Sequence, residues 1–216
     1  MSEKSFIQTS QTTISRLSNR GSYDKAVIYP ILDQTIDITV SYVVDNNPMA
    51  IPTGFIRIGD VVYIHGSVKS HFLMKLVSCE RVCLTVSMLD GLVLAQTVFH
   101  HSFNYRGVVA FARPFMVEDE AEKMEISKAF TDKVLPGRWD DDIQKPTPEE
   151  LKATAFVGLE LLEATAKIRK GGPNGSGKHS AWTGHVPLQR VFREAVPAPE
   201  MEPKIEVPDY VKKLYS

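Results

Sequence analysis

Short runs in which apolar and polar positions alternate, or β-branched residues cluster, fill the middle of the chain. Such runs are typical of β-strands, and several end at pairs that favour tight turns, such as Asp45-Asn46 and Gly59-Asp60. Asp90-Gly91 also lies between two runs and favours a type I′ hairpin turn. We therefore predict six strands, at residues 36–44, 49–58, 61–65, 81–89, 92–100 and 106–116.

A helical pattern precedes these strands, and two more interrupt them. Ser22 can cap a helix that ends near Asp33 and that Pro30 shortens or kinks. Residues 68–77 and 118–134 carry apolar residues at helical spacing. Residues 136–148 are rich in Pro and Asp and indicate a surface loop. Residues 149–168 stay open between helix and strand, because their composition favours helix while their apolar positions alternate.

Many short strands with few helices predict a mainly β (α+β) fold, an antiparallel β-barrel of about six strands with peripheral helices. The strands and helices do not alternate as a parallel sheet requires. We expect one domain over residues 21–190. A flexible arm rich in Ser, Thr and Gln precedes it at residues 1–20, and an extended proline-rich tail follows at residues 191–216.

Composition and charge remove several classes of function. The chain has 216 residues, 43% hydrophobic and 24% charged, as in ordinary globular proteins. A net charge of −1 gives no general attraction for nucleic acid or anionic membranes, so we expect neither as a partner. No run approaches the ~20 apolar residues of a membrane span, and no signal peptide pattern is visible. Cys79 and Cys83 suggest reduced thiols rather than a metal site, so cytoplasm is the expected location.

One segment carries residues suited to a phosphate group. A strand ending at His65 passes through Gly66 into an expected helix whose first turn holds Ser67, Lys69 and Ser70. Amide groups at a helix start, two hydroxyls and an ammonium together suit a phosphate monoester. The alternative is that Ser67 is only a helix cap and Lys69 a solvated surface residue.

A second glycine-rich segment imitates a nucleotide-binding loop. Residues 172–178 follow the pattern G-x-x-x-x-G-K, but His179 stands where a magnesium-binding Ser or Thr is needed. The residues before it are not a buried strand, and those after it cannot form a long helix. We expect a flexible connector rather than an ATP site.

Several short motifs, in order, carry a family resemblance. They are Pro52-Thr53-Gly54-Phe55, Tyr63-Ile64-His65-Gly66-Ser67 with Ser70, and the segments 90–95, 99–106, 136–138, 150–154, 167–169 and 182–187. Over residues 20–190 the chain resembles the pyridoxamine 5′-phosphate oxidase-related FMN-binding proteins. It is most similar to the branch that includes flavin-nucleotide-binding and nitroimidazole-resistance-type proteins.

The resemblance implies a split β-barrel that forms a homodimer, with FMN in each of two clefts between the subunits. The strand around Pro52 would lie along the isoalloxazine ring, and the turn around Ser67 would hold the phosphate. Arg106 is implied as a second contact, and Trp182 either covers the flavin or packs at the interface. The implied FMN-binding residues are Ile51, Pro52, Thr53, Phe55, His65, Gly66, Ser67, Lys69, Ser70, His71, Tyr105, Arg106 and Trp182.

Two positions depart from the family pattern. His71 stands where relatives carry Arg, and Gly107 where they carry Ser. An imidazole is mostly neutral at pH 7, so His71 would bind phosphate more weakly than Arg. The implied activity is that of an FMN-dependent oxidoreductase of unknown substrate, with no side chain assigned as acid or base. The alternatives are a non-catalytic flavin carrier or sensor, and a haem-binding split barrel with His65, His71 or His185 as axial ligand.

Overall fold

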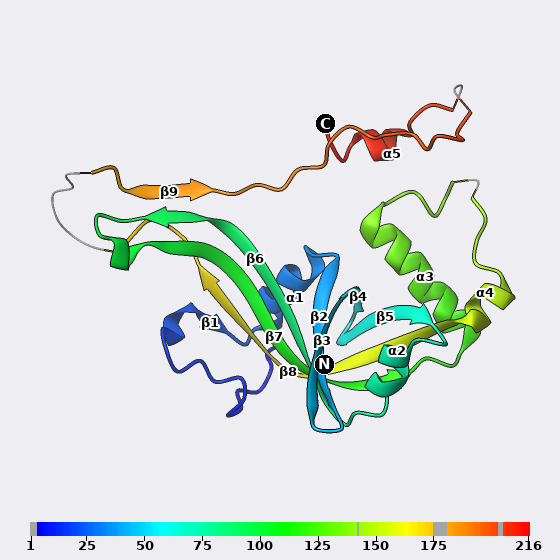
Figure 1. Ribbon diagram of the computed structural model, residues 1–216, viewed down its shortest axis with the longest axis horizontal. Helices are drawn as coiled ribbons and strands as arrows, with labels where there is room; N and C mark the ends of the chain where they lie inside the picture. Colours follow the sequence, from blue (N-terminus) through cyan, green and yellow to red (C-terminus); the bar gives the residue numbers. More distant parts are fainter. Residues whose placement is uncertain (1–3, 142, 175–180, 203–204) are drawn as a thin grey trace.

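The computed structural model describes residues 4–141, 143–174, 181–202 and 205–216 (Figure 1). Its strands are β1 (Gly21–Ser22), β2 (Asp37–Val44), β3 (Asn47–Gly54), β4 (Ile56–Ile58), β5 (Val61–Ser67), β6 (Val82–Leu94), β7 (Ser102–Met116), β8 (Thr154–Arg169) and β9 (Gly184–Pro187). Its α-helices are α1 (Lys25–Asp33), α2 (His71–Leu76), α3 (Glu120–Val134), α4 (Pro148–Ala153) and α5 (Asp209–Lys212), and 3-10 turns span Ser18–Arg20 and Val98–His100. No described helix is long and apolar enough to cross a membrane.

The strands form one sheet in the order β3-β2-β6-β7-β8-β5-β4, with β1 beside β8 and β9 beside β6. Every pairing is antiparallel. The sheet curls into an open barrel, because its terminal strands β3 and β4 do not pair with each other. The prediction of a mainly β, antiparallel barrel with few helices is confirmed. The described chain has nine strands rather than about six. The run at 49–58 divides into β3 and β4, the runs at 81–89 and 92–100 join in β6, and β1, β9 and the ambiguous stretch that becomes β8 are added.

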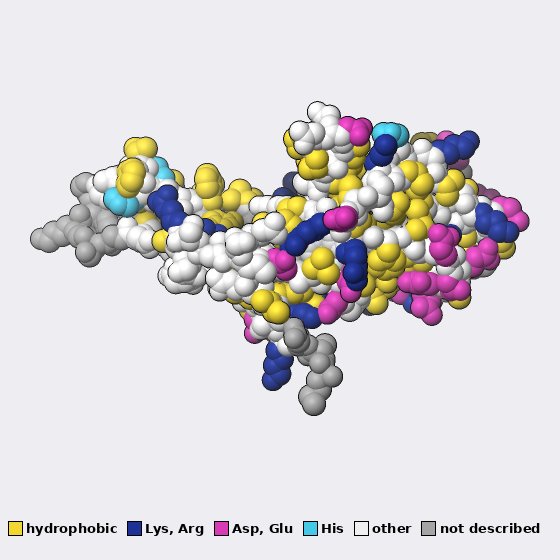
Figure 2. All heavy atoms as spheres, turned by 90° about the horizontal axis from the view of Figure 1, so that it is seen from below, with side chains coloured by type: hydrophobic (Ala, Val, Ile, Leu, Met, Phe, Trp, Pro, Cys, Tyr) yellow, Lys and Arg dark blue, Asp and Glu magenta, His cyan; other side chains and the backbone are white. Residues whose placement is uncertain are grey.

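The 16-residue strand β8 joins two parts of the molecule. Its first half pairs with β5, with Thr154 opposite Ser67. Along its other edge, β8 pairs with β7 from Val157, opposite Met116, to Arg169, opposite Tyr105. The first half of β8 builds the barrel together with parts of β6 and β7, while the second half and the adjoining parts of β6 and β7 extend away from it, with β9 alongside β6 (Figure 1). Figure 2 shows this division as a broad body with a narrower extension.

The core lies inside the barrel and follows from the alternation of apolar residues. Fully buried side chains from β2, β5, β6 and β8, including Val40, Ile64, Leu84 and Leu159, meet those of helices α1 and α2. A second, smaller cluster under α3 contains Ile126 and residues of β4, β5, α4 and β8. Helix α3 is thereby fixed against the outside of the barrel, where it forms one wall of the cavity described below.

Asp90-Gly91 is not a hairpin turn, so that prediction is wrong. The strand β6 runs through it, with a register shift between Leu89 and Gly91, and the chain reverses only between β6 and β7. Strand β9 pairs with β6 at this point. A Cβ on Gly91 would lie 2.5 Å from the backbone oxygen of Val186. The glycine thus permits close approach of another strand, which is a second use of glycine that local sequence cannot separate from a turn.

Helix boundaries also differ from the predictions. Asp24, not Ser22, caps α1 by accepting a hydrogen bond from the amide of Ala26 at 2.9 Å. Helix α2 begins at His71 with Ser70 as its cap, three residues later than predicted, so Ser67 is not a helix cap. The ambiguous stretch contains both structures, since α4 ends at Ala153 and β8 starts at the next residue.

The strand predicted at residues 49–58 is divided. It becomes β3, paired with β2, and β4, paired with β5. The break lies at Phe55, whose amide donates to the carbonyl of Ile36 at 3.1 Å and whose ring is buried in the core. The preceding turn matches its prediction, because Asp45 and Asn46 adopt φ of 49° and 62° between β2 and β3.

The terminal segments lie on the barrel and the extension. In the N-terminal segment, Phe6 is buried and Ser5 forms a bridge with Asp24. At the other end, the chain beyond β9 continues across the molecule to α5 (Figure 1). The side chains between β9 and α5 are mostly exposed, including Phe192 at 63%. The division into arm, domain and tail remains a prediction.

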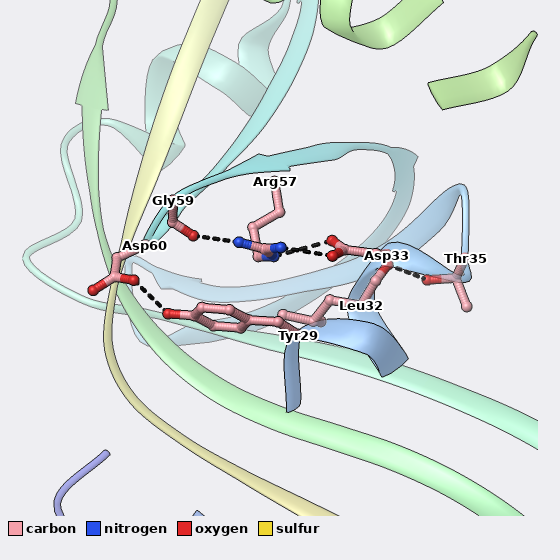
Figure 3. Close-up of polar contacts among 7 residues, drawn as sticks. All are labelled: Tyr29, Leu32, Asp33, Thr35, Arg57, Gly59 and Asp60. Atoms are coloured by element: carbon pink, nitrogen blue, oxygen red, sulfur yellow. Dashed lines mark hydrogen bonds and ion pairs between the residues drawn. The ribbon is translucent and has the colours of Figure 1, made fainter. Parts of the chain in front are cut away.

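A charged network fixes α1 to the turn between β4 and β5 (Figure 3). Asp60 accepts hydrogen bonds from Lys25 and from the hydroxyl of Tyr29. Arg57 binds both carboxylate oxygens of Asp33, at 3.0 and 2.6 Å, and its guanidinium lies 4.0 Å from the centroid of the Tyr29 ring. Burial opposes ionisation of Asp60, but the bonds from Lys25 and Tyr29 outweigh it and lower its pKa.

This network predicts a pH-dependent stability. A carboxyl whose pKa is lowered by folding stabilises the fold above its unfolded pKa of ~3.9 and loses that contribution as pH falls through the lowered folded pKa. Because Asp60 is half-exposed, we expect Asp60→Asn to cost only about 1 kcal/mol of unfolding free energy at pH 7. The difference from wild type should shrink below pH ~4 in urea titrations. The control is Asp45→Asn, whose carboxylate makes no ion pair among the described residues. An Asp60→Asn penalty that stays constant from pH 7 to pH 3 would contradict the assignment.

Candidate functional site

A cavity of about 810 Å³ lies between the barrel and α3. It is mainly apolar, and its walls come from the end of β5, from α3, from the following loop, and from α4 and the start of β8. A space of this size and character is typical of cofactor sites. The lining residues are His65, Ser127, Phe130, Thr131, Val134, Leu135, Arg138, Trp139, Ile143, Gln144, Pro146, Glu150, Leu151, Thr154 and Phe156.

His65 places an imidazole in this cavity. Its position on β5, opposite Phe156 on β8, holds its ring against that phenyl ring at a centroid distance of 5.7 Å. Phe130 from α3 meets the same imidazole edge-on at 4.5 Å. Partial desolvation by these rings lowers the pKa of His65, although the residue stays exposed toward the cavity, so its imidazole is neutral at pH 7. A neutral imidazole, still accessible from the cavity, is the form of histidine that binds metals.

The loop after α3 brings one cation to the rim of the cavity. Arg138 Nη1 donates to Asp141 at 3.3 Å and to the hydroxyl of Tyr210 at 3.1 Å. Tyr210 comes from α5, and its ring packs within 3.5 Å of the position that a Cβ on Gly137 would occupy. The C-terminal helix is thereby attached to the rim of the cavity.

The predicted phosphate segment forms a turn between β5 and α2. The hydroxyl oxygen of Ser67 accepts from the amide of Lys69 at 3.1 Å, and that of Ser70 accepts from Leu73 at 3.4 Å. Lys69 and His71 are exposed, and neither has an ion-pair partner within the described parts of the chain. The segment thus keeps its cation free for a ligand, while its two hydroxyl oxygens already shape the turn.

The predicted ring-binding strand is β3, which ends the sheet. It pairs with β2 along one edge, so its other edge offers backbone groups that no strand of the sheet uses. Ile51 and Thr53 are half-buried and Pro52 is exposed. Phe55 is fully buried beneath Lys133, whose Nζ lies 3.7 Å from the ring centroid. Only backbone atoms of Phe55 could therefore serve a ligand.

The other predicted contacts lie on the extension. Arg106 binds both carboxylate oxygens of Asp90, at 2.8 and 2.7 Å, and also bonds Gln34. Trp182 is 66% exposed near β9. Ser67 and Tyr105 pair with opposite ends of β8, fifteen residues apart, which is roughly 50 Å along a strand. Within one chain, the extension residues do not join the turn around Ser67.

Several features of the cavity were not predicted from the sequence. Phe130 was expected only as one of the apolar residues at helical spacing in 118–134, and Arg138 only as part of the motif at 136–138. Neither position carries a local signal that it borders a cavity, because the cavity arises where α3 meets β5 and β8. The nucleotide-loop imitation cannot be judged as a whole, since Lys178 and His179 lie outside the described residues.

The open antiparallel barrel with its extension defines a split-barrel protein. A family model described as pyridoxamine 5′-phosphate oxidase matches residues 24–168. The chain therefore belongs to the pyridoxamine 5′-phosphate oxidase family, as the sequence resemblance predicted.

Solved structures extend the similarity over nearly the whole chain. The flavocytochrome Anf3 from Azotobacter vinelandii is 32% identical, with a TM-score of 0.87 over 95% of this chain and 97% of that chain. The FAD and heme binding protein from Mycobacterium smegmatis is 29% identical, with a TM-score of 0.84 over 91% and 97%. A putative 5-nitroimidazole antibiotic resistance protein from Bacteroides thetaiotaomicron shares the fold at 19% identity, with a TM-score of 0.57 over 68% and 86%. The search of curated proteins gave no match.

Proposed function

We propose that this protein is a flavocytochrome-like oxidoreductase, which binds haem in the apolar cavity and a flavin at the turn between β5 and α2. The observation that carries the proposal is the neutral imidazole of His65 inside a cavity of about 810 Å³ with Arg138 at its rim. Two similar structures, a flavocytochrome and an FAD and heme binding protein, support the pairing of the two cofactors.

The cavity residues fit haem by their chemistry. Histidine is the usual proximal ligand of haem iron, and His65 is the only histidine among the described residues that line the cavity. Phe130, Phe156 and the aliphatic side chains of Val134 and Leu135 match an apolar macrocycle, while Arg138 suits a propionate at the rim. When bound, haem supplies redox chemistry at its iron. His65 would hold the group, and the apolar walls would exclude water from it.

The turn from Gly66 to His71 and the free edge of β3 fit the flavin. The side-chain ammonium of Lys69 suits its phosphate, because the amides of Val68, Lys69 and Ser70 already donate hydrogen bonds within the protein. The unpaired edge of β3 suits the polar edge of the flavin ring. FMN remains our specific proposal, although FAD offers a phosphate to the same turn. No side chain is assigned as general acid or base, since the flavin itself carries the redox chemistry. The substrate and electron donor stay open.

We place the flavin site between two copies of the chain. The turn around Ser67 and the side chain of Arg106 are too far apart to meet within one chain. A second copy can bring its extension, with Arg106, to the first copy's barrel. The extension also exposes large apolar side chains that a partner would cover, among them Phe99 at 89%, Phe103 at 55% and Trp182 at 66%. The free thiols of Cys79 and Cys83 agree with a cytoplasmic setting.

Absorption spectroscopy of the purified protein tests both cofactors. We expect a Soret band together with flavin absorption near ~450 nm, and a flavin released on denaturation that chromatography identifies as FMN or FAD. A yellow protein without a Soret band, even after haem is added, would remove the haem half of the proposal. A colourless protein that takes up neither group would remove it entirely.

Lys69→Ala should weaken flavin binding. If its ammonium contacts the phosphate, its loss removes a charge-assisted bond worth about 1–3 kcal/mol, or a 5- to 150-fold higher Kd. Fluorescence quenching of added FMN by the apoprotein measures this. Lys75→Ala, which removes a lysine from the last turn of α2, is the matched control and should bind FMN as the wild type does. Equal affinity of Lys69→Ala and wild type would return Lys69 to a plain surface role.

A further inference from the structure

A second, smaller cavity lies at the C-terminal end of β8. His65 pairs with the other half of that strand, at Phe156. The volume of this second cavity is about 310 Å³, and we call it the basic pocket. Three of its lining residues are cations, Arg20, Arg169 and Lys170, and two are amides, Asn19 and Asn174. No Asp or Glu is found among its described lining residues. The basic pocket thus gathers positive charge and hydrogen-bond donors without an acidic counterpart.

Arg169 is the buried element of this pocket. Arg169 is the last residue of β8 and is only 5% exposed. The guanidinium donates to Asn104 Oδ1 at 2.5 Å, to the carbonyl of Gly171 at 3.2 Å and to the carbonyl of Gly172 at 3.0 Å. All three acceptors are neutral. A guanidinium has five N–H donors, so two have no partner among the described residues and can serve a ligand.

The charge of Arg169 is therefore fixed in place without a carboxylate to balance it in the described chain. The charge of Lys170 contributes to the lowered pKa of Asp90, but both carboxylate oxygens of Asp90 are already bound by Arg106 at 2.8 and 2.7 Å. A buried cation without a counter-charge is unfavourable, and an anion in the adjacent space relieves it. Arginine pairs most readily with planar or tetrahedral oxyanions.

We infer that the basic pocket binds a phosphoryl group, held by the two free donors of Arg169 and by the side chains of Arg20 and Lys170. Its volume admits a phosphate or pyrophosphate group with part of a small molecule attached. The amides of Asn19 and Asn174 can bond the oxygens that face away from Arg169. The phosphoryl group comes either from a separate phosphorylated ligand or from a flavin that reaches across from another copy of the chain.

Isothermal titration of the purified holoprotein with inorganic phosphate and with pyrophosphate tests the inference, with chloride at matched ionic strength as the reference. If a separate ligand is bound, phosphate or pyrophosphate binds saturably. Arg20→Gln should then weaken that binding about 10-fold or more, with flavin and haem content unchanged. Arg16→Gln, which alters a nearby exposed cation outside the pocket, should bind as the wild type does. Arg169→Lys keeps the positive charge but loses the planar set of guanidinium donors, so this variant should also bind phosphate or pyrophosphate more weakly.

If the flavin supplies the phosphoryl group, the holoprotein takes up no free phosphate, but Arg20→Gln loses flavin about 10-fold more readily than Arg16→Gln. The inference is overturned if wild-type holoprotein binds neither anion and Arg20→Gln retains flavin like wild type. That result would leave the cofactor proposal standing, because the haem and flavin spectra report on His65 and Lys69 independently.

Discussion

Replacing His65 with alanine is expected to remove haem from the protein. The substitution deletes the one imidazole that the described part of the chain places in the cavity, while leaving the aromatic walls and Arg138 in place. Loss of the axial ligand should lower haem affinity by about 100-fold or more. The Soret absorbance per protein, after reconstitution with added haem, measures the effect. The flavin should remain, since Lys69 and the free edge of β3 are unchanged.

His71→Ala and His185→Ala are the matched controls, because both were candidate axial ligands from the sequence alone. His71 lies at the start of α2 and His185 on β9, and neither lines the cavity. Both variants should keep the Soret band. If His65→Ala keeps it and either control loses it, the haem site proposed here is in the wrong place.

Gly91→Ala is expected to release β9 and the tail that follows it. The added methyl carbon would lie 2.5 Å from the backbone oxygen of Val186 and 3.1 Å from the Cα of Pro187. Because these neighbours are backbone atoms rather than a mobile side-chain end, β9 must move away from β6. Trypsin should then cleave after Arg190 and Arg193 about 10-fold faster. If the tail also contacts a partner, the dimer should dissociate at a higher protein concentration in sedimentation experiments.

Gly172→Ala provides the control for this prediction. A Cβ at Gly172 meets open space, and its carbonyl still accepts the bond from Arg169. Its tail should resist trypsin as in wild type. Equal cleavage rates for Gly91→Ala and wild type would mean that β9 tolerates the methyl group in place, and that its contact with β6 does not hold the tail.

Most strands were predictable because one face of each packs in the barrel. The run before Asp45 alternates cleanly, and its turn conformation agrees with its residues. The prediction failed at Gly91 because the reason for that glycine is a strand nearly a hundred residues further along the chain. Local patterns record which residues favour a turn, but they do not record which distant strand comes close.

The residues of the candidate site also differ in whether the sequence could predict them. The turn around Ser67 and Lys69 was visible because its residues are adjacent in sequence. The cavity was not, since Phe130, Arg138 and Phe156 meet His65 only through tertiary packing. Arg106 had an unexpected partner for the same reason, because Asp90 lies across the β6–β7 pair. The basic pocket joins Arg20 and Arg169, which are separated by most of the domain.

The position of β8 has a consequence for how the chain reaches its native state. Strands β1, β5 and β7 all pair with β8, which is the last long strand to be synthesised. Until it emerges from the ribosome, β5 and β7 each have an open edge, and β5 lies about ninety residues before its partner. Folding that depends on such distant pairings is slow, and open strand edges favour aggregation in the interval. We therefore expect fragments that end before residue 154 to remain unfolded and to aggregate, while chains that include β8 fold in one late cooperative event.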